Sequence, residues 1–114
     1  MSNHGKEVLN ELRAPTRQLR KAIPDVYRAF GELHHEALAE GELDVRTKEL
    51  IALAISITKL CDGCIASHAR GAAKAGATSQ EVAEAIGVAI LMNGGPATIY
   101  GPRALEAFEE FASE

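Results

Sequence analysis

Apolar residues recur every three or four positions along most of the chain, which is the spacing that places side chains on one face of an α-helix. The first such stretch covers residues 8–12 and resumes over residues 19–23, with Pro15 between them. A proline inside a helix removes a backbone donor and clashes with the preceding turn, so we expect a break or kink at Pro15. No segment shows the strict alternation of apolar and polar residues that is typical of a half-buried strand.

The middle of the chain predicts two further helices. Pro24 fits the first turn of a helix that ends near Gly41. Asp44 is a suitable N-cap for the next one, which we expect over about Val45–Leu60. This third helix contains the run "LIALAISI" and is apolar on most sides. We therefore expect it at the centre of the fold or in a subunit interface.

The C-terminal half carries clear signals for helix ends. A fourth helix should begin near Asp62, as its cap, and end near Gly76, where a left-handed residue suits a helix C-terminus. Thr78 and Glu81 have the spacing of a capping box for a fifth helix. The run "NGGP" ends that helix, and Pro96 begins a last one.

Length and composition agree with an all-α fold, a compact single domain of about six helices over residues 1–114. The chain has 20 alanines and only 5 aromatic residues, which favours helices whose backbones approach closely. Its net charge of −4 excludes the clustered basic face that nucleic-acid binding requires. Because no apolar leader or bilayer-length segment stands out, we expect a cytoplasmic protein without a membrane partner.

The segment "KLCDGCIASHA" holds both cysteines and one of the four histidines. If Asp62 caps the fourth helix, Cys64 lies in the first turn, where free backbone N–H groups and the helix dipole favour a thiolate. His68 follows one helical turn later on the same face, within reach of Cys64 as a base or a stabilising cation. Cys61 is close enough to form a disulfide with Cys64. The segment thus offers a nucleophile, a resolving thiol and a base.

Two structural interpretations compete with redox chemistry. Structural zinc sites use four ligands, and this segment offers only Cys61, Cys64 and His68, without a second CxxC or a histidine pair at zinc-finger spacing. Free cysteines can also fill space as small apolar residues. The thioredoxin interpretation of a CxxC would need a βαβ unit, which the pattern lacks. We expect no metal and no cofactor, and a zinc-binding or structural oligomer is kept as an alternative.

Three longer runs carry a family resemblance: "KELIALAISI", "CDGCIASHARGAAKAGAT" and "EVAEAIGVAILMNGG". Together they resemble the alkylhydroperoxidase D-like (AhpD-like) members of the carboxymuconolactone decarboxylase family, over roughly residues 24–110. The resemblance implies an all-helical fold, assembly as a homo-oligomer (a trimer or hexamer), and thiol peroxidase activity on small-molecule hydroperoxides. It also implies an external thiol reductant, which in the family's peroxidases is a lipoyl-bearing protein.

The resemblance assigns roles to four residues. The family motif has a glutamate twelve residues before the first cysteine, which is Glu49 here. It implies that Cys64 becomes the sulfenic acid and that Cys61 is the proton donor and resolving thiol. Glu49 and His68 would serve as a proton relay.

Other activities remain open at this stage. The best-known peroxidase members carry a histidine between the two cysteines, whereas this chain has Gly63 next to Cys64. A general disulfide oxidoreductase without a peroxidase role is therefore an alternative. A second is decarboxylation of a carboxymuconolactone, although those decarboxylases do not use a CxxC.

The remaining aromatic candidates receive structural interpretations. His34 and His35 are adjacent, so they point in different directions on a helix and cannot form a metal pair. We expect one of them to be exposed and the other packed. Tyr100, beyond the glycines of "NGGP", is expected in the core.

Overall fold

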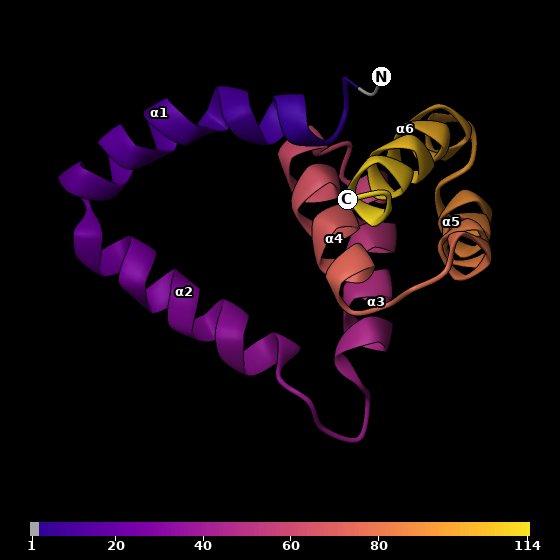
Figure 1. Cartoon of the computed structure of the whole chain (residues 1–114), viewed down its shortest axis with the longest axis horizontal. Coiled ribbons are helices and arrows are strands. Elements are labelled where there is room, and N and C mark those ends of the chain that lie inside the picture. The colour runs from indigo at the N-terminus through magenta and orange to yellow at the C-terminus, as the bar shows by residue number, and fades with distance from the viewer. Residues whose placement is uncertain (1–2) are drawn as a thin grey trace.

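The computed structural model describes residues 3–114, and within this range it contains six helices and no strand. The all-α prediction is thereby confirmed. Figure 1 shows the helices in chain order. They are α1 (Lys6–Ala22), α2 (Pro24–Leu38), α3 (Val45–Thr58), α4 (Asp62–Lys74), α5 (Ser79–Asn93) and α6 (Gly95–Ala112).

Helices α3 to α6 pack against one another and form the body of the molecule (Figure 1). Its centre holds fully buried side chains from all four of these helices, and the large ones include Leu53, Val82 and Phe108. Alanines such as Ala69 and Ala104 are also fully buried. Because alanine adds little bulk, the helix backbones approach closely around these few large residues.

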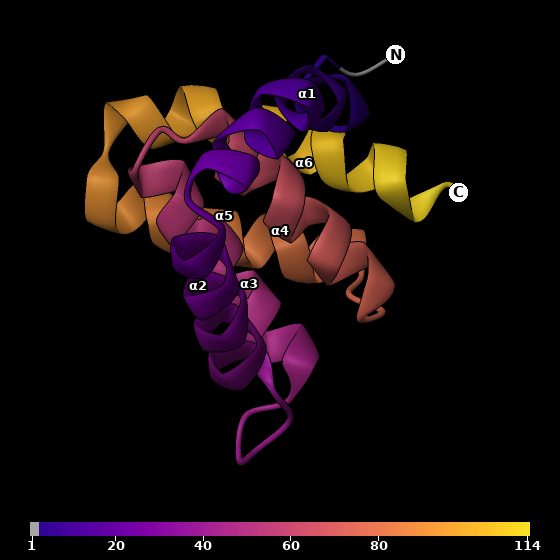
Figure 2. The ribbon, with the colours of Figure 1, turned by 90° about the vertical axis from the view of Figure 1, so that its left-hand side faces the viewer.

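Helices α1 and α2 form an arm that leads away from the body and returns to it (Figures 1 and 2). Val8 is the one buried side chain in α1, and α2 has none. The large apolar side chains of the arm are instead exposed: Leu12, Leu19, Ile23, Val26, Phe30 and Leu33. The arm is thus amphipathic without a partner for most of its apolar face.

Polar contacts fasten both ends of the arm to the body. At the start of α1 the Lys6 N–H donates to Glu110 Oε1 over 3.0 Å. A Cβ at Gly5 would collide with the same carboxylate, so the Glu110 side chain would have to move to accept a larger residue there. Beyond the end of α2 the Lys48 ammonium donates to the Ala39 carbonyl at 2.6 Å, close to the helix terminus whose dipole favours a cation.

We expected a break or kink at Pro15. The break was wrong, because α1 runs through this residue without interruption, and the kink stays a prediction. Pro15 and Glu11, whose carbonyl loses its helical partner, are both exposed. Water can therefore replace the missing hydrogen bond, and the helix continues beyond the proline.

Most of the predicted helix ends are confirmed. The Asp44 carboxylate accepts from the Thr47 N–H over 2.7 Å. Hydrogen bonding from the side chain of Thr47, and then from its backbone N–H, lowers the pKa of Asp44. Thr78 and Glu81 form the reciprocal capping box, and Gly76 has a left-handed φ of 85°.

Among residues 3–114, none of the helices combines the length and apolar character that crossing a bilayer requires.

Candidate active site

The turn between α3 and α4 fixes the positions of the two cysteines at the start of α4. Leu60 has a left-handed φ of 55°, which is unusual for a residue other than glycine. Its N–H donates to the Ile57 carbonyl over 3.1 Å, and the Cys61 N–H donates to the Ser56 carbonyl over 3.2 Å. These two bonds are the pair that defines a Schellman motif. They close the end of α3 and bring the chain directly into α4.

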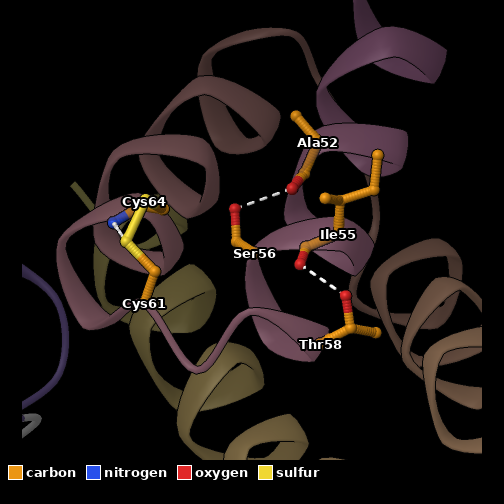
Figure 3. The surroundings of a disulfide bond; sticks show 6 residues. All are labelled: Ala52, Ile55, Ser56, Thr58, Cys61 and Cys64. Carbon is orange, nitrogen blue, oxygen red and sulfur yellow. Dashed lines mark hydrogen bonds between the residues drawn. A yellow bond between two sulfur atoms is a disulfide. The ribbon is translucent and has the colours of Figure 1, made fainter. Parts of the chain in front are cut away.

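Cys61 and Cys64 form a disulfide across the first turn of α4, with their Cα atoms 5.2 Å apart (Figure 3). The predicted cap was wrong: Cys61 is the N-cap, and Asp62 is the first residue of the helix. The Schellman turn leaves Cys61 extended, with φ −106° and ψ 98°. Its sulfur therefore reaches the Cys64 N–H, which donates to Cys61 Sγ over 3.2 Å.

The two sulfurs have different surroundings. Cys64 is exposed, whereas Cys61 is half-buried. The Cys61 sulfur also receives the backbone N–H of Cys64 at the positive end of the helix dipole. An incoming thiol or peroxide can thus reach Cys64, while a negative charge on Cys61 is stabilised by the helix start.

Glu49 and His68 come together on facing sides of α3 and α4. Glu49 is only 8% exposed, and its Oε1 lies 2.6 Å from His68 Nδ1. With Glu49 ionised, the bond requires the proton on Nδ1, which leaves Nε2 to exchange a proton with other groups. His68 lies one turn after Cys64 on α4, so the i,i+4 spacing places its ring on the same side of the helix.

Gly71 makes this pair fit, and the sequence analysis overlooked it. It lies in the last turn of α4, and a Cβ there would collide with the carboxyl group of Glu49. A glycine inside a helix costs about 0.5–1 kcal/mol relative to alanine, so its presence within "HARG" was a usable signal for close packing.

Gly63 also has a close neighbour. A Cβ at this position would lie 2.9 Å from Leu12 Cδ1, on α1 of the arm. The side chain of Leu12 thus lies over the residue between the two cysteines. This is the place where the best-known peroxidases of the resembling family carry a histidine.

The expectation for the adjacent histidines was wrong, since His34 and His35 are both exposed. His34 nevertheless stacks on His68, with ring centroids 5.9 Å apart and ring planes inclined by 13°. The sequence reasoning missed this contact because the two rings come from α2 and α4, and nothing local predicts that these helices meet. Tyr100 is partly buried against the core, as expected.

Comparison with models of known families shows which protein family the chain belongs to. The family model described as "carboxymuconolactone decarboxylase family" matches residues 24–110. The chain belongs to the carboxymuconolactone decarboxylase family. This confirms the resemblance seen in the sequence. In this fold the present chain carries a CxxC pair that forms a disulfide.

Solved structures agree with this membership. A family protein from Legionella pneumophila is 39% identical, with a TM-score of 0.92 over 97% of this chain and 99% of that one. Another, from Thermotoga maritima, is 32% identical with a TM-score of 0.70 over 76% and 90%. An involvement in an antioxidative response has been suggested for the Thermotoga protein. An uncharacterized protein of Cupriavidus necator is 34% identical over 96% of each chain.

The zinc alternative gains no support from the geometry. Among residues 3–114, no three histidine, cysteine, aspartate or glutamate side chains are grouped as a metal site would need. His68 is instead bonded to Glu49, and the cysteines are bonded to each other. The residues of the CxxC are thus arranged for disulfide chemistry.

Proposed function

We propose that this family member is a thiol-dependent peroxidase that reduces hydroperoxides through a Cys61/Cys64 dithiol–disulfide cycle. The observation that carries the proposal is the exposed residue Cys64, one turn from a histidine that is held by a buried glutamate. Family membership supports a thiol oxidoreductase in general, and the suggested role of the Thermotoga relative supports the peroxidase form.

The oxidation begins at Cys64. Its thiolate attacks the terminal oxygen of the hydroperoxide, the O–O bond breaks, and the alkoxide takes a proton to leave as an alcohol. This step converts Cys64 to the sulfenic acid. His68 is the proposed proton donor to the leaving alkoxide, and Glu49 stabilises the charged imidazole during the transfer.

Resolution uses the neighbouring thiol. The Cys61 sulfur attacks the sulfenic acid of Cys64, forms the disulfide and releases water. The short Cα separation of 5.2 Å lets this reaction occur without moving the helix.

Reduction of the disulfide by an external dithiol completes the cycle. The reductant's thiolate attacks exposed Cys64, and Cys61 leaves as a thiolate that keeps the hydrogen bond from the Cys64 N–H. The second thiol of the reductant then releases Cys64 and becomes oxidised itself. A lipoyl-bearing protein would supply such a dithiol, and we propose that the cycle operates in the cytoplasm.

The test is hydroperoxide consumption with dithiothreitol as the reductant. We expect steady turnover of tert-butyl hydroperoxide by the wild type and background rates for Cys64→Ser. Glu49→Gln should lose about 10²-fold or more in rate, since general acid–base groups typically contribute about 10²–10⁴-fold. Wild-type turnover that survives in Cys64→Ser would contradict the proposal.

A general disulfide oxidoreductase is the second candidate. The observation that favours it is Gly63 under the Leu12 side chain, which leaves no proton-transferring group between the cysteines. This alternative predicts rapid thiol–disulfide exchange with dithiothreitol but no acceleration of hydroperoxide reduction.

We also propose that the protein is a homo-oligomer, a trimer or hexamer as in its family. The exposed apolar face of the arm supports this, because monomers rarely expose so large an apolar surface. So does an apolar hollow of about 340 Å³ between α3 and α5, lined in part by Ile51, Ile55, Val88 and Met92. Sedimentation velocity at micromolar concentration tests the assembly, and a monomer there would rule it out.

A further inference from the structure

We propose that His34, on the arm, is a positioning residue that holds the His68 ring in its working orientation. The proposal rests on the proposed thiol chemistry of the same site and goes beyond the glutamate, cysteines and histidine already assigned to it. Its basis is the parallel stack between the two imidazoles, with centroids 5.9 Å apart and planes inclined by 13°.

The stack adds a second constraint to the hydrogen bond between His68 and Glu49. Its hydrogen bond to Glu49 fixes one atom, Nδ1, at 2.6 Å from the carboxylate. A ring held at one edge atom can still tilt about that bond, and the direction of Nε2 changes with the tilt. A second ring against the face restricts the tilt, because offset parallel stacking is favourable only when the two planes stay nearly aligned.

His34 is itself placed by its own helix. Phe30, one turn earlier on α2, lies with its ring centroid 6.5 Å from that of His34, at an angle of 51°. The rings of Phe30, His34 and His68 therefore form a continuous series from the arm to the buried carboxylate of Glu49. No side chain of α2 is buried, so this series gives the exposed helix a specific contact with the candidate active site.

The direction of Nε2 matters because proton transfer depends steeply on geometry. A misplacement of about 1 Å in a reacting group can cost about 10²-fold in rate. Loss of a contact that restricts only tilt should cost less than loss of the histidine itself. We expect a reduction of about tenfold in the rate at which the hydroperoxide oxidises Cys64.

The chain provides a matched control in His35. It is the same residue type, is exposed like His34, and differs in pointing elsewhere on α2. Three variants separate the alternatives: His34→Ala removes the ring, His34→Phe keeps a ring but cannot carry a proton, and His35→Ala removes the neighbouring imidazole. Because both histidines are exposed on a helix without buried residues, circular dichroism should show all three variants folded.

The experiment combines a kinetic and a spectroscopic measurement. The first is the single-turnover rate of Cys64 oxidation by tert-butyl hydroperoxide in the reduced protein. The second is the NMR position of the His68 ring protons, which a stacked ring shifts and an absent ring does not. Loss of the signal in His68→Gln assigns it.

We expect His34→Ala to oxidise about tenfold more slowly and to lose the ring-current shift of His68. His34→Phe should keep the shift and stay within about twofold of wild type, because stacking needs a ring and not a proton. His35→Ala should match wild type in both measurements.

Three results would overturn the proposal. They are a wild-type rate and His68 signal in His34→Ala, a His34→Phe variant as slow as His34→Ala, or an equal loss in His35→Ala. The second of these would mean that the His34 imidazole moves protons. If the wild type is not oxidised faster than free cysteine, the peroxidase function fails instead. The His34 contact is then decided by the NMR signal alone.

Discussion

The body and the arm use similar residues in opposite ways. Phe108 in the body is 1% exposed, whereas Phe30 in the arm is 62% exposed. The body buries a core of apolar side chains within one chain and can hold a hydrogen-bonded pair, Glu49 and His68, in fixed positions. The arm buries almost nothing, yet it places Leu12 over Gly63 and His34 over His68. Stability thus resides in the body, while the arm determines what surrounds the cysteines.

The largest expected effect comes from truncating a phenylalanine in each region. Phe108→Ala should cost about 3–5 kcal/mol of unfolding free energy, because it leaves a cavity in a closely packed core. Phe30→Ala should cost less than about 0.5 kcal/mol in dilute protein. Its effect should grow with protein concentration if a second subunit covers the arm. Urea denaturation at two concentrations measures both, and equal losses in dilute protein would refute the division into body and arm.

Substituting alanine at two glycines within helices should change the stability in opposite directions. Gly71→Ala should destabilise the protein by about 1–3 kcal/mol, because its Cβ displaces the Glu49 carboxyl group from a packed site. Gly31→Ala, on the arm, has nothing within 4 Å and should stabilise by about 0.5–1 kcal/mol.

The same two glycine variants should also differ in hydroperoxide turnover. Gly71→Ala should also reduce hydroperoxide turnover, because it breaks the contact between Glu49 and His68, whereas Gly31→Ala should keep the wild-type rate. Thermal unfolding and the turnover assay check both variants. A stable and fully active Gly71→Ala protein would show that the buried pair is not needed.

The turn that presents the cysteines should prefer glycine. Leu60 has a left-handed φ of 55°, and this conformation costs a residue with a Cβ about 1–2 kcal/mol. We expect Leu60→Gly to be more stable than Leu60→Ala by about 1 kcal/mol, the reverse of the order at an ordinary helical position. The difference in urea midpoint between these two variants is the measurement, and the ordinary order would refute the assigned strain.

The smallest expected effect concerns the contact between arm and body at the cysteines. Gly63→Ala brings a Cβ to 2.9 Å from Leu12 Cδ1, and this flexible side chain can move aside at modest cost. A double-mutant cycle with Leu12→Ala should show a coupling of about 0.5–1 kcal/mol, the double variant recovering most of the loss. Strictly additive losses would mean that the arm does not rest on Gly63.

Local rules predicted the body well and the arm poorly. The six helices, the Asp44 cap and the capping box of Thr78 and Glu81 follow from spacing over a few residues. The break expected at Pro15 was wrong because the continuity of the helix there depends on its exposure to water, which local sequence does not reveal. The N-cap of α4 was assigned to Asp62 instead of Cys61. The left-handed residue before it is Leu60, whereas a glycine would have indicated such a turn in the sequence.

The site was predicted in part for a similar reason. The disulfide partners and His68 share one short segment, so spacing alone brought them together. Glu49 was placed in the site by family resemblance, and its bond to His68 depends on how α3 folds back along α4. His34 could not have been found this way, because its contact joins helices that are distant in sequence.

The most direct test of the central claim is a single turnover of the reduced protein with one equivalent of tert-butyl hydroperoxide. The account predicts that both thiols are lost, one tert-butanol is released per chain, and peptide mapping finds the Cys61–Cys64 disulfide. In Cys61→Ser the reaction should stop at a sulfenic acid on Cys64 that dimedone traps. Two results would contradict the account. One is a rate of thiol loss in the protein no faster than that of free cysteine, and the other is a sulfenic acid trapped on Cys61 in the Cys64→Ser variant.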